Sequence, residues 1–221
     1  KLSKNFSRIS LLNESTIIAG SGALDKSLSE FATENSLGGF EFLSCIPGTI
    51  GGGIRMNSGC FGNEFKDILI SVQAVNRLGE VLTIPRKDII FEYRSCNLPK
   101  DLIFLSASFK GKKKEKEKIK EEVKDLKNKK EKAQPTKIKT GGSTFKNPIK
   151  QTDKKVWEII KESIPGNTQF GEAIVSNKHA NFFINKGNAN YNDMKKLIDF
   201  VKKSVKKKTG IDLDLEIEII G

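Results

Sequence analysis

Six glycines fall within the fifteen residues from Gly48 to Gly62, in the runs Ile46-Pro-Gly-Thr-Ile-Gly-Gly-Gly-Ile54 and Asn57-Ser-Gly-Cys-Phe-Gly62. Backbone without Cβ atoms can take positive φ and approach a ligand closely, so successive N–H groups can surround phosphate oxygens or a flat ring system. Pro47 removes one donor and sets the angle at which the chain enters the segment. The segment predicts a site for a large anionic cofactor; a glycine-rich hairpin without a ligand is the alternative.

The length and composition are those of a globular protein. The 221 residues exceed the commonest domain size of about 100 to 150 residues, which predicts one or two small domains. The chain is 37% hydrophobic and 30% charged, and no apolar run approaches the roughly 20 residues of a membrane helix. Three cysteines without C-x-x-C spacing argue against a disulfide framework and a zinc site. We therefore expect a cytoplasmic protein with no membrane association.

The formal net charge of +12 raises the question of nucleic-acid binding. Much of the excess lies between Lys110 and Lys132, where twelve lysines and six acids surround an apolar stripe of Ile119, Val123 and Leu126 at helical spacing. Only five of the 39 basic residues are Arg, and no aromatic stacking platform accompanies the lysines. This pattern predicts a solvated helix and disfavours nucleic acid, although a positive surface also attracts nucleotides. No obligate protein partner is evident.

Hydrophobic periodicity predicts helices and strands in an α+β arrangement. The expected strands cover residues 16–19, 71–77, 80–84, 102–109, 173–176, 182–185 and 213–220. The expected helices cover residues 24–35, 110–132, 153–163 and 192–208, with a loop over 134–148. The change in composition near residue 110 predicts a domain boundary there. Gly20-Ser-Gly22 follows a strand, as in a dinucleotide fingerprint, but Asp25 stands at the third glycine position, so this signal is weak.

Four further motifs identify a family. They are Phe91-Glu-Tyr-Arg94-Ser, Thr140-Gly-Gly-Ser143-Thr-Phe-Lys-Asn147-Pro148, Ser176-Asn-Lys-His-Ala-Asn-Phe-Phe-Ile-Asn185 and Leu215-Glu216-Ile-Glu-Ile-Ile-Gly221. Together with the two glycine runs, and in this order and spacing, they resemble the MurB family, the UDP-N-acetylenolpyruvoylglucosamine reductases. The resemblance extends over nearly the whole chain, which makes it far more specific than any single motif.

The resemblance implies an α+β fold with two domains. Residues 1–110 would form an FAD-binding domain of the PCMH/VAO type, and residues 111–221 would form a linker helix and a MurB C-terminal substrate-binding domain whose last strand returns to the active site. The enzyme would carry FAD, take a hydride from NADPH and reduce UDP-N-acetylglucosamine enolpyruvate to UDP-N-acetylmuramate, a peptidoglycan precursor. The short interval between Arg94 and Ser143 indicates the type that lacks a substrate-capping insertion.

The same resemblance implies which residues bind the ligands. The FAD-binding residues would be Gly20, Ser21, Gly22, Ile46, Pro47, Gly48, Thr49, Ile50, Gly51, Gly52, Asn57 and Gly62. The substrate-binding residues would be Asn147, His179 and Lys132, with Lys132 at the diphosphate. Family members usually carry a Gly-Ser-Asn loop ahead of the point where this chain starts, so we expect the N-terminal portion of the cofactor site to be missing. Cys45 replaces a more usual glycine, and we expect it to be a small buried residue.

Three residues would carry the chemistry. Hydride delivery to the terminal carbon of an enol ether leaves charge on the adjacent carbon, which then needs stabilisation and a proton. Arg94 offers a planar cationic fork for the substrate carboxylate. Ser143 would donate the proton, and Glu216, in a protonated or shared-proton state, would hydrogen-bond the carboxylate or tune the proton supply.

Each assignment has a structural alternative. Ser143 could cap a turn, Arg94 could pair with Glu92 on the surface, and a lone histidine such as His179 is more often structural than catalytic. Glu216 and Glu218 share one face of an alternating segment, so only the family register selects Glu216. Two other functions remain open: a different FAD oxidoreductase of the same fold superfamily, and a Ser143–His179 hydrolase, which lacks the closing glycine of a nucleophile elbow.

Overall fold

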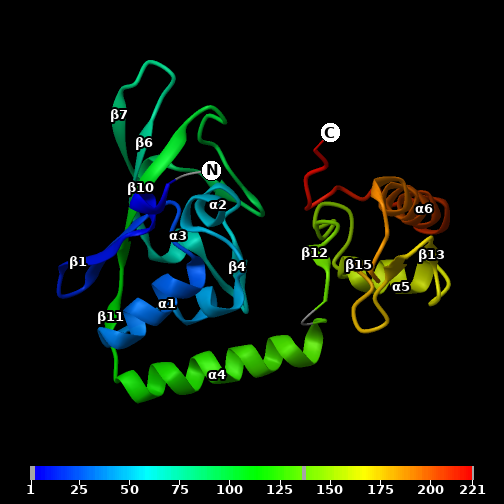
Figure 1. The fold of residues 1–221 in the computed structure, drawn as a ribbon, viewed down its shortest axis with the longest axis horizontal. Helices are drawn as coiled ribbons and strands as arrows, with labels where there is room; N and C mark the ends of the chain where they lie inside the picture. The colour runs from blue at the N-terminus through cyan, green and yellow to red at the C-terminus, as the bar shows by residue number, and fades with distance from the viewer. Residues whose placement is uncertain (1–2, 136–137, 221) are drawn as a thin grey trace. The chain divides into compact units, whose positions relative to one another are not determined.

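The computed structural model describes residues 3–135 and 138–220, and the chain folds as two compact units, Lys1–Lys130 and Glu131–Gly221 (Figure 1). Helix α4 (Lys116–Ala133) belongs mostly to the first unit, whereas the boundary expected near residue 110 assigned it to the second. The reason is that its apolar stripe packs on the first unit, where Ile119 is 1% exposed. Lys114, just before α4, adds an ion pair of 3.0 Å to Glu41.

The first unit is built on an antiparallel sheet of five strands in the order β1-β2-β10-β6-β7. Their bounds are Ile9–Asn13 (β1), Thr16–Gly20 (β2), Ile103–Lys110 (β10), Leu69–Val75 (β6) and Val81–Pro85 (β7). The strands predicted over 16–19, 71–77, 80–84 and 102–109 are therefore confirmed to within a few residues. Buried and exposed positions alternate along β6, as expected when one face of a sheet packs on a core.

Helices α1 (Asp25–Glu34), α2 (Ile50–Arg55) and α3 (Phe65–Ile68) lie on one side of this sheet (Figure 1). Phe65 makes edge-on ring contacts with Phe42 and Phe109, at centroid distances of 6.3 and 6.0 Å. Short elements complete the unit: the 3-10 helices Lys4–Ser7 (η1), Glu41–Cys45 (η2) and Arg86–Asp88 (η3), and the strand pairs Leu37–Gly38 (β3) with Lys112–Lys113 (β11), Gly59–Cys60 (β4) with Asn63–Glu64 (β5), and Phe91–Glu92 (β8) with Ser95–Cys96 (β9).

The second unit has its own sheet and core. The antiparallel strands run in the order Thr140–Ser143 (β12), Phe182–Asn185 (β15), Ala173–Val175 (β14) and Gln169–Phe170 (β13). Helices α5 (Val156–Ser163) and α6 (Tyr191–Thr209) pack on it; α6 is capped by the Asn190 side chain and ended by Gly210 in the left-handed conformation. The face of α6 expected to be apolar is buried at Leu197, Ile198, Val201 and Val205.

Three local predictions were wrong. Residues 213–220 do not form a strand: only an isolated bridge joins Leu215 to Phe145, since no further partner strand lies beside the alternating segment in the described chain. The expected loop over 134–148 contains β12, which pairs with β15 although its glycines give it no strand signature. The lysine-rich helix begins at Lys116 and not at 110, because residues 112 and 113 pair with β3. Residues 136, 137 and 221 lie outside the described chain.

Within the described ranges, none of the helices has the length and hydrophobicity required to cross a lipid bilayer. The same residues contain no cluster of three or more histidine, cysteine or acidic side chains able to hold a metal ion. All three cysteines are free, and Cys45 is buried, as expected for a small core residue. Burial raises the pKa of the Cys60 thiol to about 12, so at neutral pH this residue is a thiol and not a nucleophile.

Candidate functional site

The glycine segment 46–52 is held in place by backbone hydrogen bonds to the chain that follows β2. Gly51 N donates to Ser21 O at 2.8 Å and Ile50 N to Ala23 O at 2.9 Å, while Asp25 N donates to Gly48 O at 3.2 Å. Ser21 is in turn fixed to β10, since its N–H and hydroxyl donate to the carbonyls of residues 105 and 104. The tight pairing favours glycine at 51, because a Cβ there would lie 3.1 Å from the Ser21 Cβ and 3.2 Å from the Ser21 carbonyl oxygen. The segment is therefore a preformed backbone surface.

A groove of about 290 Å³ opens beside this segment. Four of the residues predicted to bind FAD line it: Ser21, Thr49, Gly51 and Gly52. The N–H groups of Thr49 and Gly52, which line it, and of Gly48, the residue before Thr49, have no hydrogen-bond acceptor among the described residues. Three such backbone donors within five residues of a glycine segment suit the oxygens of a diphosphate. This geometry fits the cofactor that the sequence predicts.

Two cationic residues of the groove were missed by the sequence reasoning, Arg55 and Lys100. The Arg55 guanidinium donates to the carbonyls of Leu98, Pro99 and Leu102 at 2.9 to 3.0 Å, and it stacks over the Phe104 ring at 4.3 Å. Because these partners are neutral, they orient the guanidinium and leave its charge uncompensated. The groove is thus electropositive, as an anionic cofactor requires. No local motif marks Arg55 or Lys100, and only the fold brings them to the glycine segment.

Gly20 and Gly22 have a structural explanation in the approach of Phe6. A Cβ at Gly20 would lie 2.1 Å from the Phe6 carbonyl oxygen, and one at Gly22 would lie 3.2 Å from the same atom. The N–H groups of Gly20 and Gly22 donate to the carbonyls of Arg8 and Phe6. These two donors are therefore used within the protein, and the two glycines shape the site through close backbone packing.

Asn57 and Gly62 lie on the chain that follows α2. Asn57 is fully buried with φ 40°; its amide donates to a Glu64 carboxylate oxygen at 2.8 Å and to Glu92 O at 3.3 Å, and its carbonyl accepts from Lys66 N. Its side chain thus ties the β8–β9 hairpin to the glycine runs. Gly62, with φ 87°, forms the tip of the β4–β5 hairpin, where positive φ favours glycine.

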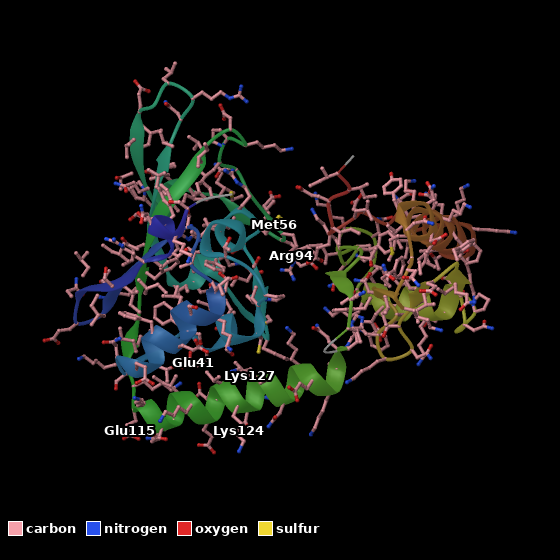
Figure 2. The ribbon with its side chains drawn as sticks, viewed as in Figure 1. Glu41, Met56, Arg94, Glu115, Lys124 and Lys127 are labelled. Atoms are coloured by element: carbon pink, nitrogen blue, oxygen red, sulfur yellow. The ribbon has the colours of Figure 1, made fainter. Side chains whose placement is uncertain are left out.

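Arg94 lies in the two-residue turn between β8 and β9, and Figure 2 shows it at the end of this hairpin. Its φ is 56°, a conformation that non-glycine residues adopt rarely and that is concentrated at functional sites. The guanidinium carbon lies 4.8 Å from the centre of the Tyr93 ring, which restricts its orientation. The half-buried Arg94 is thus presented by a strained turn that Asn57 anchors.

In the second unit, the chain segments that carry Ser143 and Glu216 pair through their backbones. Ser143 ends β12 opposite Phe182, directly after Gly142 with φ 86°. Next along the chain, Thr144 O accepts a hydrogen bond of 2.9 Å from Glu216 N, and the Phe145–Leu215 bridge extends the pairing. Both Ser143 and Glu216 are half-buried, whereas Glu218 is exposed. The structure therefore distinguishes the two glutamates, which the alternating sequence could not do.

Asn181 fixes the backbone after Ser143 and was not recognised as a separate functional residue. It is 2% exposed; its carbonyl oxygen Oδ1 accepts from Phe145 N at 2.9 Å and its amide donates to Phe145 O at 2.8 Å. Asn181 O also accepts from Thr144 N at 2.8 Å. This buried side chain therefore joins the chain around residue 181 to the chain that follows Ser143. The only sequence signal for Asn181 was its place in the motif Ser176–Asn185.

The residues expected to bind substrate have different environments. Asn147 is half-buried, and its Oδ1 accepts from Val156 N at 3.0 Å, at the start of α5. The His179 ring packs edge-on against Phe182 at 4.8 Å and near Trp157 at 6.0 Å, and burial lowers its pKa below the usual value. Lys132 is exposed on α4. Among the described residues no hydrogen bond joins Ser143 to His179, so the pair lacks the contact of a hydrolase dyad.

Known proteins match this chain along its whole length. A model of the UDP-N-acetylenolpyruvoylglucosamine reductase C-terminal domain matches residues 134–220, and a model of an FAD binding domain matches residues 1–85. A UDP-N-acetylenolpyruvoylglucosamine reductase from Pelagibacter ubique is 65% identical over 220 residues, which are 100% of this chain and 73% of that protein. The Rickettsia conorii protein of the same name is 43% identical, over 100% of this chain and 74% of its own.

The fold agrees with a solved structure of the same kind. The crystal structure of UDP-N-acetylenolpyruvylglucosamine reductase (MurB) from Thermus caldophilus superimposes with a TM-score of 0.83 at 28% sequence identity. The match covers 97% of this chain and 74% of that one. With its FAD-binding and MurB C-terminal domains, this chain belongs to the UDP-N-acetylenolpyruvoylglucosamine reductase (MurB) family.

Proposed function

We propose that this chain, like its family, reduces UDP-N-acetylglucosamine enolpyruvate to UDP-N-acetylmuramate, a step of peptidoglycan precursor synthesis, with NADPH as the hydride donor. The observation that supports the proposal is the backbone pairing of Thr144 with Glu216, which brings the chain segments that carry Ser143 and Glu216 next to each other. An oxidase of the same superfamily would need no such serine and carboxylate pair.

The residues of the first unit fit FAD. The N–H groups of Gly48, Thr49 and Gly52, which have no acceptor among the described residues, would bind its diphosphate, and Arg55 and Lys100 add positive charge to the groove that Thr49 and Gly52 line. Gly20, Gly22 and Asn57 support this surface through backbone packing and buried hydrogen bonds. Ile46, Pro47, Ile50 and Gly62 remain proposed cofactor contacts. When bound, FAD supplies the hydride that adds to the enolpyruvyl double bond.

Arg94, Ser143 and Glu216 perform the polar part of the reaction. Arg94 binds the substrate carboxylate and stabilises the charge that develops next to it once the terminal carbon has received hydride. The Ser143 Oγ–H gives its proton to that adjacent carbon, which completes addition of H⁻ and H⁺ across the double bond. Glu216 hydrogen-bonds the carboxylate end of the substrate. Asn181, by holding residues 144 and 145, positions the serine.

The substrate-binding residues remain part of the proposal. Asn147 lies four residues after Ser143, and the hydrogen bond from Val156 N, at the start of α5, to its side-chain oxygen orients this side chain. His179, neutral at physiological pH because burial lowers its pKa, presents an uncharged ring beside Trp157, which suits a hydrogen bond or stacking partner better than a phosphate. Lys132 is a cation for the UDP diphosphate.

A flavin spectrum and a turnover assay on the full-length protein test the proposal. We expect a yellow protein with flavin absorbance bands, and NADPH oxidation that depends on the enolpyruvyl UDP-sugar, with one NADPH consumed per product. NADPH oxidation that proceeds equally without the UDP-sugar would indicate an oxidase. A colourless protein that hydrolyses ester substrates would indicate the hydrolase alternative.

A further inference from the structure

A carboxyl group is enclosed directly behind the glycine segment. Asp25, the first residue of α1, is 0% exposed, and neither of its side-chain oxygens has a hydrogen-bond partner among the described residues. Buried polar groups are hydrogen-bonded in the large majority of cases, because desolvation without a partner costs free energy. A buried carboxyl group without hydrogen-bond partners, such as that of Asp25, therefore requires a functional or energetic explanation.

The position of Asp25 ties it to the segment 46–52. Its own N–H donates to Gly48 O at 3.2 Å, and the neighbouring residues Leu24 and Thr49 form a bridge. A Cβ built at Gly48 would lie 2.9 Å from Oδ2 of Asp25, so the absence of a side chain at 48 leaves the room that the carboxyl group occupies behind the turn. The carboxyl group is thus next to a residue whose N–H we assigned to the FAD diphosphate.

The charged groups on the surrounding elements are engaged elsewhere. Lys26 of α1 pairs with Glu30 at 3.4 Å, and Glu41 of η2 pairs with Lys114 at 3.0 Å. Arg55 of α2 binds three backbone carbonyls. The segment 46–52 itself carries no ionisable side chain. Among the described residues no cation is therefore placed to stabilise an Asp25 carboxylate, and burial raises the pKa of Asp25 to about 7.

We propose that Asp25 is a proton-linked positioning residue for the cofactor segment: FAD binds to the protein in which this carboxyl group is neutral, so binding takes up one proton when Asp25 starts ionised. The inference rests on the proposed FAD site. An ionised Asp25 would put a negative charge immediately behind the turn that receives the diphosphate, where two negative charges repel each other strongly. When Asp25 is neutral this repulsion is absent, and the segment 46–52 can keep its packing against the carboxyl group while the diphosphate is bound.

The test measures FAD affinity against pH, with the full-length apoprotein and flavin fluorescence quenching between pH 6 and 9. In the unmodified protein the Kd for FAD should be constant below about pH 7 and then rise, by at most about tenfold per pH unit for a single linked proton. Asp25→Asn, a neutral isostere, should give a flat profile. The control Glu30→Gln removes an exposed acid of the same helix and should keep the profile of the unmodified protein.

Calorimetry gives a second readout, which counts the linked protons directly. Titration of FAD at pH 8 in two buffers of different ionisation enthalpy should reveal uptake of close to one proton by the unmodified protein and by Glu30→Gln, and near zero by Asp25→Asn. Zero uptake by the unmodified protein, or an unchanged pH profile in Asp25→Asn, would overturn the proposal for Asp25 while leaving the FAD site intact. Failure of the proposed function would look different, because no FAD would then bind at any pH.

Discussion

Glu216 N and Thr144 O are joined by a hydrogen bond of 2.9 Å, and this contact fixes the backbone of the half-buried Glu216 beside the residue that follows Ser143. The two glutamates of the C-terminal segment are separated by one residue, and only one of them has this environment. The contact explains how a segment that forms no regular strand can still contribute one defined side chain to a site.

The pair Glu216 and Glu218 offers a matched comparison. Glu216→Gln should lower kcat for the enolpyruvyl substrate by about 10²-fold or more, since an amide cannot share a proton as a carboxyl group does. Glu218→Gln, on the exposed neighbour, should retain nearly full activity. Steady-state NADPH oxidation by both variants measures the difference, and equal activities would remove Glu216 from the catalytic set.

Ser143→Ala should separate the two half-reactions. Bleaching of the flavin absorbance by NADPH needs no proton from Ser143, so its rate should change little. Recovery of that absorbance upon addition of the enolpyruvyl sugar should slow by about 10²- to 10⁴-fold, the usual contribution of a positioned acid. Stopped-flow absorbance with each substrate mixed separately resolves the two phases. Equal slowing of both phases would contradict the role of proton donor.

Arg94→Lys should reduce kcat/KM strongly, by about 10²-fold or more, because an ammonium group cannot reproduce the two parallel hydrogen bonds of a guanidinium to a carboxylate. The flavin content should be unchanged, since Arg94 is not among the residues of the cofactor groove. Absorbance at the flavin bands and steady-state kinetics on the same sample give both quantities. Wild-type kcat/KM in this variant would refute the assignment.

Asn57→Ala should destabilise the first unit by about 2–4 kcal/mol, because it removes a buried side chain that makes three hydrogen bonds and leaves their partners unpaired. It also puts alanine at φ 40°, where asparagine is better tolerated. Asn63→Ala, on an exposed position of β5, is the matched control and should cost little. Urea unfolding of both variants measures the free energies. A loss of the same size at both positions would show that Asn57 has no special structural role.

Asp25 also makes stability depend on pH. Its pKa is about 7 in the folded protein and near 3.9 unfolded, so the folded state holds a proton that the unfolded state has lost. The free energy of unfolding should therefore fall as pH rises from about 4 to 7, by on the order of 4 kcal/mol in total. His179 acts in the opposite sense, because burial lowers its pKa and acidification below about 6.5 favours the unfolded state.

The Asp25 contribution is isolated by a difference between two proteins. The free energy of unfolding of Asp25→Asn, subtracted from that of the unmodified apoprotein at each pH, cancels the effect of His179. The difference should shift in favour of the variant between pH 5 and pH 8. A difference that does not change with pH would contradict a raised pKa for Asp25.

Much of the fold follows from local sequence patterns. The period of the apolar residues predicted four strands of the first sheet, all except β1, and the helices α1, α5 and α6, because each depends on side chains within a few residues of one another. The glycine density from Gly48 to Gly62 likewise indicated a ligand-binding backbone, since the absence of Cβ atoms is a local property. Family motifs, and not periodicity, selected Arg94, Ser143 and Glu216.

Other features depended on partners distant in the sequence. The alternating residues 213–220 predicted a strand, yet a strand exists only where another strand pairs with it, and in the described chain the pairing reduces to the single bridge at Leu215. The burial of Asp25 behind Gly48 and the approach of Arg55 to the glycine segment also have no local signature. The sequence by itself determined which segments form helices, strands and close-packed backbone, because those depend on neighbours along the chain. The tertiary structure decided which polar groups are buried, paired or left without a partner, because those properties depend on neighbours in space.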